Sequence, residues 1–153
     1  MKKSIGIFMM LLCTVIFMSS CTKDVAYLPG TWKATSATIN GEDKDDMQDV
    51  WTFNTDGSTC NIDCDFDKYF SNNLYDVVTF EGTYNTSGNS ILKIESNDFN
   101  VSGNDYDKII YDLDIDLLNK NSMMVAGTVK FFQHRGGIIN TKTSKISLRF
   151  SKR

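Results

Sequence analysis

The chain has 153 residues, a net charge of −3 and a pI near 5.0, and 41% of its residues are hydrophobic. It contains no basic patch and no basic stretch interleaved with aromatic residues, so we expect no nucleic-acid partner. If residues 1–20 are removed, as argued next, 153 − 20 = 133 residues remain, which suits one domain with its own core.

The first twenty residues have the pattern of a secretory signal peptide. Two lysines open the chain, a nearly unbroken apolar run extends from Ile5 to Met18, and two serines follow. The apolar run is ~14 residues long, whereas a membrane-spanning helix needs about 20. The pattern therefore predicts a signal peptide over residues 1–20 rather than a membrane span.

The end of this segment points to lipid attachment. Met18-Ser19-Ser20-Cys21 resembles the lipobox of bacterial lipoproteins, in which the cysteine becomes the first mature residue and carries acyl chains such as palmitate. The resemblance implies a lipid anchor at Cys21, a tether over 21–27 and a domain over 28–153. No Asp directly follows the cysteine, which by resemblance to Gram-negative lipoproteins favours the outer membrane, on either its periplasmic or its outer side. The alternative is a signal peptide that is uncleaved or cleaved in the ordinary way, with an incidental cysteine.

Alternation of apolar and polar residues with period two recurs after residue 21 and predicts strands. In residues 109–117, apolar side chains fall on one face and three aspartates on the other. Turn signals such as Asn40-Gly41 and Gly136-Gly137 separate the segments. We expect strands over residues 31–39, 49–54, 58–66, 76–85, 90–95, 107–117, 122–132 and 144–151. The acidic stretch 42–49 is compatible with a short helical turn.

Eight such strands predict an all-β, antiparallel fold, either an up-and-down β-barrel or a β-sandwich. The first strand opens with Leu28-Pro29-Gly30-Thr31-Trp32, and Gly-x-Trp at that place is the signature of lipocalins. Trp51-Thr52-Phe53 with the turn Asp56-Gly57, and then Gly82-Thr83-Tyr84, follow in an order similar to the lipocalin-like domains of short Gram-negative lipoproteins. This resemblance covers nearly all of the mature chain and implies the eight-stranded barrel.

The lipocalin resemblance also implies specific contacts and a ligand. In that family a late arginine packs on the motif tryptophan, which makes Arg149 the candidate partner of Trp32, although the alternation directs Arg149 outward. The Thr-Asp-Tyr triplet of larger lipocalins is absent, and Asn104-Asp105-Tyr106 is a faint echo of it. Members of the family bind varied small apolar molecules, and many have no known ligand.

Cys60 and Cys64 are the only mature cysteines besides Cys21. In an extended strand, positions four apart are ~13 Å apart, whereas a disulfide needs Cα atoms within about 7 Å. We therefore expect two buried thiols, with a local disulfide left open in case the strand bends there. No nearby His or further Cys completes a metal site.

The carboxylates are expected to be solvated. Asp63-x-Asp65-x-Asp67 and Asp112-x-Asp114-x-Asp116 resemble the start of a calcium loop, but both lack its Gly at position six and Glu at position twelve. We interpret them as solvated strand faces. A solvated loop is likewise favoured over a weak cation site for Glu42, Asp43, Asp45, Asp46 and Asp49. The sequence therefore predicts neither a metal nor a cofactor.

Catalysis has little support in the sequence. His134 is the only histidine, at an expected strand end or hairpin, and nothing places a nucleophile beside it. The chain has no Gly-rich phosphate loop. We expect no enzymatic activity, with an enzyme as the minor alternative.

The inward-facing aromatic residues are the remaining candidates for ligand binding: Trp32, Trp51, Phe53, Phe80, Tyr84, Tyr111 and Phe131. They would either line an apolar cavity or fill it, because an eight-stranded barrel is just wide enough to be filled by its own side chains. The first hypothesis is a monomeric, membrane-anchored lipocalin-like module that binds a small apolar or amphipathic molecule. The second is a structural or interaction lipoprotein with a filled core, acting through loops 41–49 and 67–73.

Overall fold

The computed structural model describes residues 24–70, 77–97 and 106–153. The expected signal peptide, the anchor residue Cys21 and part of the expected loop 67–73 lie outside the described residues. In the described part of the chain no helix is long and apolar enough to cross a membrane.

The described residues form one sheet with nine strands, a 3-10 turn and a short helix. In chain order these are η1 (Val25–Tyr27), β1 (Gly30–Ile39), β2 (Glu42–Lys44), β3 (Val50–Phe53), β4 (Thr59–Asp65), α2 (Phe66–Tyr69), β5 (Val77–Ser87), β6 (Ile91–Ser96), β7 (Tyr106–Leu118), β8 (Ser122–Arg135) and β9 (Ile138–Lys152).

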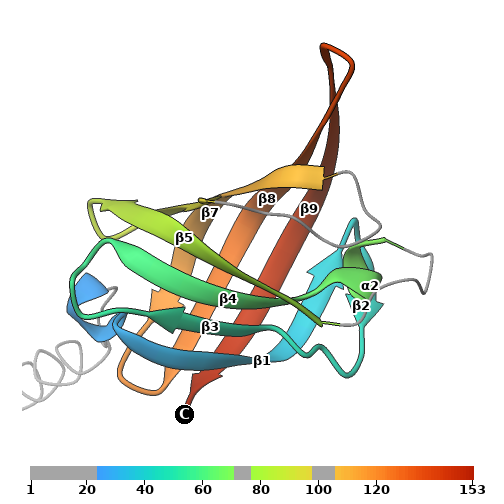
Figure 1. The fold of residues 1–153 in the computed structure, drawn as a ribbon. Helices are drawn as coiled ribbons and strands as arrows, with labels where there is room; N and C mark the ends of the chain where they lie inside the picture. The colour runs from blue at the N-terminus through green and yellow to red at the C-terminus, as the bar shows by residue number, and fades with distance from the viewer. Residues whose placement is uncertain (1–23, 71–76, 98–105) are drawn as a thin grey trace, which may run out of the picture.

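The sheet closes into a barrel (Figure 1). From β3 onward, each strand pairs antiparallel with the next, and β1 pairs with both β3 and β9. Of the nine strands, β2 pairs with β1 alone, which leaves eight in the closed barrel. The predicted eight-stranded up-and-down barrel is therefore confirmed, and the sandwich alternative is wrong.

The acidic stretch after the first strand adds a strand instead of a helical turn. Asn40 and Gly41 have φ values of 53° and 85°, the left-handed pair that a tight hairpin turn requires. This turn folds Glu42–Lys44 back along β1, so that Lys44 lies opposite Ala37. The compatibility with a helical turn noted from the sequence was misleading, because the Asn-Gly dipeptide fixes the geometry.

Most predicted strand ends lie within one residue of those in the structure, and the larger differences are at the end of β5, which extends to Ser87, at the end of β8, which extends to Arg135, and at the start of β9. The expected strand 58–66 ends at Asp65, and Phe66 begins α2. The last strand begins at Ile138 rather than 144, because a tight turn at Gly136-Gly137 lets β8 and β9 pair up to Arg135 opposite Ile138. Residues 138–143 are exposed on both faces, so the alternation that marks a half-buried strand is missing there.

A register shift changes one core position in β7. The pairing with β8 slips between Ile115 and Leu117, as at a β-bulge. Beyond the slip, Leu118 is buried and Leu117 is only half-buried, so the period-two assignment of Leu117 to the inner face was wrong.

The Gly-x-Trp motif lies at the end of the barrel next to η1, which we call the N-terminal end, and its contacts stabilise this end. Gly30 has a φ of 122°, and a Cβ there would lie 2.8 Å from Cε of Lys152. Both the backbone conformation and the available space therefore favour glycine at this position. Trp32 is fully buried, and its indole N–H donates to the carbonyl of Leu28 at 2.7 Å.

Lys152, not Arg149, is the cation beside the motif tryptophan. Its Nζ lies 4.9 Å from the centre of the Trp32 ring and donates to the Tyr27 carbonyl at 2.7 Å. Arg149 is exposed and lies opposite Ser36 of β1. The family-derived assignment to Arg149 was wrong because that residue has outward parity in β9, whereas Lys152 shares the inward parity of Phe150.

Candidate functional site

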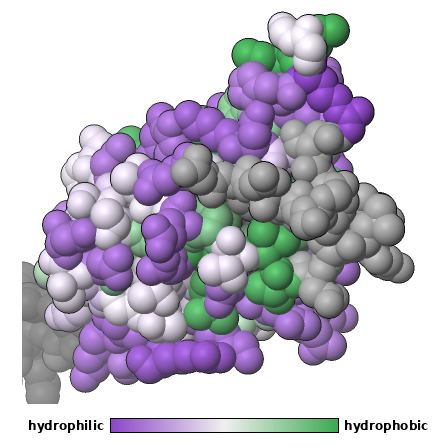
Figure 2. All heavy atoms as spheres, in the orientation of Figure 1, coloured by the Kyte–Doolittle hydropathy of each residue, from purple (hydrophilic) through white to green (hydrophobic). Residues whose placement is uncertain are grey.

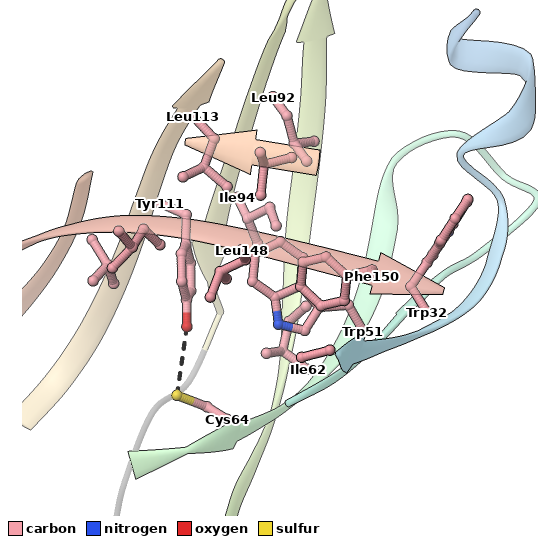
Figure 3. Packing of buried hydrophobic residues seen from close by; sticks show 14 of the residues in the cluster. Trp32, Trp51, Ile62, Cys64, Leu92, Ile94, Tyr111, Leu113, Leu148 and Phe150 are labelled. Atoms are coloured by element: carbon pink, nitrogen blue, oxygen red, sulfur yellow. Dashed lines mark hydrogen bonds between the residues drawn. The ribbon is translucent and has the colours of Figure 1, made fainter. Parts of the chain in front are cut away.

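The middle of the barrel is filled by aromatic rings. Trp51 on β3 and Tyr111 on β7 are four strands apart in the closed ring of eight, so they face each other across its full width. Their ring centroids are nevertheless only 5.2 Å apart, and Phe150 packs on Trp51 at 4.7 Å (Figure 3). All three side chains are fully buried. At this level the barrel holds its own side chains.

All seven aromatic residues that the sequence placed inside are buried, but the structure divides them among different levels. Trp32 lies at the N-terminal end, and Phe53 contacts Tyr84 at 4.9 Å between ring centroids. Trp51 and Tyr111 meet in the middle, whereas Phe131 belongs to a separate cluster described next. The seven side chains therefore lie at more than one level of the barrel.

An aromatic cluster lies at the opposite end of the barrel, which we call the α2 end. The cluster is Phe66, Tyr69, Phe70, Tyr106 and Phe131. Phe66 stacks on Phe70 at 4.4 Å, and Phe70 lies 4.7 Å from Phe131 of β8. Nζ of Lys142 lies 3.9 Å from the centre of the Phe70 ring, and burial lowers the pKa of this lysine. Helix α2 thus places two aromatic side chains over the barrel interior.

A buried carboxylate, Asp49, links α2 to the barrel. The amide N–H of Asp65 donates to its Oδ1 at 2.6 Å, and the hydroxyl of Tyr69 donates to its Oδ2 at 3.1 Å. The indole N–H of Trp51 donates to the same Oδ2 at 3.3 Å. Burial raises the pKa of Asp49 to about 7, although these three hydrogen bonds to the carboxylate oppose that rise.

Asp65, the residue before α2, is also buried and completes this link. Its carboxylate accepts the amide N–H of Gln48 at 2.9 Å. Asp49 and Asp65 therefore each accept a main-chain bond from the other's segment. The sequence interpretation as solvated residues was wrong for both. The burial of Asp49 could have been predicted, because this residue lies two positions before Trp51 and therefore on the same, inward face of the strand.

The two mature cysteines are free and buried, as predicted, and no disulfide joins them. The hydroxyl of Tyr111 donates to Sγ of Cys64 at 3.5 Å (Figure 3). Burial raises the pKa of Cys60 to about 12 and that of Cys64 well above its ordinary value. Because the thiolate is the reactive form, these thiols behave as small hydrophobic side chains.

Polar clusters outside the core are ordinary surface pairs. In residues 24–70, 77–97 and 106–153, no group of three or more His, Cys, Asp or Glu side chains could hold a metal ion. His134 lies near the end of β8, where the sequence placed it, and its Nδ1 is 2.5 Å from Oδ2 of Asp107. Lys130 pairs with Asp112 at 3.1 Å.

Two adjoining hollows of about 330 and 170 Å³ are lined mainly by residues of β4 and β5 and by Asn97, the residue after β6. Both are lined by Asn61, Glu81 and Asn97, which are polar and at least partly exposed. The buried Phe80 borders the larger one. The hollows lie at the sheet surface between these strands. Their polar lining differs from the apolar lining that is expected of a lipid-carrying site.

Comparison of the chain with protein families, curated proteins and solved structures found no significant match. The structure itself establishes a closed eight-stranded antiparallel β-barrel with one extra strand.

Proposed function

We propose that this chain is a lipoprotein of the bacterial outer membrane, anchored at Cys21, whose lipocalin-like barrel acts through surface contacts with another protein and has no enzymatic activity. The filled midsection carries this choice over an internal carrier, because Trp51 and Tyr111 meet across the barrel with 5.2 Å between ring centroids. A molecule the size of a fatty acid needs a cavity of about 300 Å³ or more, whereas the rings of Trp51, Tyr111 and Phe150 pack against one another in the middle of the barrel.

The anchor is supported by the resemblance of Met18-Ser19-Ser20-Cys21 to a lipobox. The test is intact-mass measurement of the protein extracted from its host's membranes. We expect a mature chain starting at Cys21 with the added mass of acyl chains, and a Cys21→Ser variant that leaves the membrane fraction. An unmodified wild-type chain with an intact Cys21 would contradict the anchor.

The absence of an internal ligand is tested by native mass spectrometry of the same preparation. We expect the mass of the acylated chain alone, and no uptake of a fluorescent fatty acid. A co-purified small molecule that is retained in a Cys21→Ser variant would contradict the filled-core proposal, since it could not be the anchor itself.

The α2-end cluster favours a second candidate, a carrier of a small amphipathic anion. Phe66, Phe70 and Phe131 supply an apolar surface, and the ammonium group of Lys142 lies beside it. Such a ligand would have to replace α2 over the barrel interior. This candidate predicts fatty-acid binding that a Lys142→Met substitution weakens, and the first proposal predicts no binding in either protein.

A further inference from the structure

The β8–β9 hairpin extends beyond the rest of the barrel (Figure 1). Pairing of β9 with β1 ends at Ile146, and pairing of β8 with β7 ends at Gln133, so the last part of the hairpin has only its own two strands. At its tip Ile138 and Ile139 are 65% and 60% exposed, and hydrophobic surface lies at the tip in Figure 2. We call residues 134–143 the hairpin arm.

One edge of the arm offers unpaired backbone groups. The carbonyl of Lys145 accepts the amide N–H of Asn40, and the Lys145 amide donates to the Asn40 side chain, so the backbone of Lys145 faces away from β8. Backbone direction alternates along an antiparallel strand, which turns the N–H and C=O groups of Ile139, Thr141 and Thr143 to the same side. No strand of the described residues pairs with this side beyond Ile146. The edge is a template for one more strand.

The basic charge of residues 130–145 favours an acidic partner. Residues 130–145 contain Lys130, Arg135, Lys142 and Lys145 and no Asp or Glu, although the whole chain carries a net charge of −3. Of these four cations, Lys130 is paired with Asp112 of β7. Two copies of the arm would bring these basic residues together, which disfavours self-pairing. An acidic strand would be attracted, and the two exposed isoleucines would contact its apolar side chains.

We infer that the free edge of β9 at Ile139–Thr143 binds an extended, acidic segment of a partner protein by β-strand addition. This inference rests on the proposed interaction role and names the surface that performs it. Main-chain hydrogen bonds to Ile139, Thr141 and Thr143 hold the segment, and the cations of residues 135–145 select acidic side chains. Lys152 adjoins Tyr27 at the N-terminal end, and Ile138 lies 14 residues away along β9, about 46 Å at ~3.3 Å per residue. A chain anchored at Cys21 therefore presents the arm away from its anchor.

Random twelve-residue peptides displayed on phage and panned against the full chain in detergent test this inference. We expect the selected peptides to be rich in Asp or Glu together with β-branched residues. In solution, Thr141→Pro should weaken binding of a selected peptide about tenfold or more, because proline removes one edge N–H and blocks the added strand. The matched control Thr141→Val keeps that N–H and should bind within about twofold of the wild type.

A charge variant keeps the test valid if the proline variant fails to fold. Lys145→Glu should weaken binding several-fold and lower its salt dependence, whereas Lys120→Glu, in the turn at the other end of the barrel, should do neither. Thermal unfolding of each variant establishes that it is folded.

Three results would overturn the inference. If neither Thr141→Pro nor Lys145→Glu weakens binding of the selected peptides, the contact lies elsewhere on the protein, and the proposed interaction role is unaffected. A dimer in sedimentation experiments that Thr141→Pro abolishes would assign the edge to a second copy. Binding to phosphatidylglycerol vesicles that needs Ile138 and Ile139 but not the edge N–H would assign the arm to a lipid surface. A co-purified internal ligand, by contrast, would remove the proposed function itself.

Discussion

At the N-terminal end of the barrel, Trp32 donates to the Leu28 carbonyl and lies beneath Lys152, so a large apolar side chain holds the end together. At the α2 end, a buried carboxylate holds the chain through Tyr69 and the amide of Asp65. Apolar packing varies little with pH, whereas the energy of a buried carboxylate depends on its ionisation. One barrel can therefore have a pH-independent end and a pH-sensitive end.

The largest expected effect is on the N-terminal end. Trp32→Ala should lower the free energy of unfolding by about 3–5 kcal/mol, because it removes a fully buried indole and leaves a cavity. Urea unfolding monitored by circular dichroism measures the loss. Tyr27→Ala, at a side chain that is 39% exposed, should change stability by less than about 0.5 kcal/mol. Equal losses in the two variants would show that Trp32 does not hold this end.

The second prediction concerns the pH dependence of the α2 end. Asp49 has an ordinary pKa of 3.8 and a pKa of about 7 in the folded chain, so between these values the folded chain binds more protons than the unfolded one. Its contribution is therefore complete below about pH 4 and lost as pH rises through 7, on the order of 4 kcal/mol in total.

Urea unfolding between pH 4 and 8 measures the slope of the free energy of unfolding against pH. In Asp49→Asn the part of the slope due to Asp49 should disappear, because an amide does not ionise in this range. The matched control Asp114→Asn, on the exposed face of β7, should keep the wild-type slope. Identical slopes in wild type and Asp49→Asn would show that Asp49 does not control the α2 end.

The Gly-x-Trp part of the N-terminal end was predictable from sequence because Gly30 and Trp32 are only two residues apart. The cation beside Trp32 was not, because Lys152 contacts Tyr27 across 125 residues of chain and only the closed barrel brings them together. Most of the barrel was predictable from sequence, since each strand carries its own period-two pattern. The register slip after Ile115 was not, because a bulge leaves no mark in that pattern.

The α2 end was not predictable because its determinants are distant in sequence. Asp49 lies in a run of acidic residues that composition assigns to solvent, and its donors from Asp65 and Tyr69 come 16 and 20 residues later. Only the closed barrel brings these groups together. The hairpin arm was missed for a different reason, because a strand solvated on both faces has no alternation.

The third prediction concerns the hydrogen bond that Tyr69 donates to Asp49. Losing a donor to an ionisable carboxylate should cost a pH-dependent amount of stability, unlike losing a donor to a neutral carbonyl. Tyr69→Phe removes one donor to Asp49 and should cost about 2 kcal/mol at pH 8, where the carboxylate is ionised, and about 1 kcal/mol at pH 5. Tyr84→Phe removes a donor to the neutral carbonyl of Asn54, so its cost should be the same at both pH values. Unfolding at the two pH values measures both variants, and a pH-independent loss in Tyr69→Phe would contradict an ionised Asp49 at pH 8.

The smallest expected effect tests the cation at the N-terminal end. Lys152→Met keeps the apolar stem beside Gly30 but removes the ammonium group from the Trp32 ring and from the Tyr27 carbonyl. The loss should be about 0.5–1 kcal/mol, since the ammonium is partly exposed and water replaces its contacts. Arg149→Met, at the position that family resemblance assigns to this role, should change stability by less than about 0.5 kcal/mol.

Urea unfolding of both variants at low and high salt decides between the two cations. A larger loss of stability in Arg149→Met would mean that a side chain on the outer face of β9 covers Trp32, which contradicts the alternation that places Phe150 inside. A larger loss in Lys152→Met would mean that the alternation of inward and outward side chains continues to Lys152, the last residue of the strand. The same end of β9 would then close the barrel over Trp32 and fix η1 through Tyr27, which joins the start of the domain to its final strand.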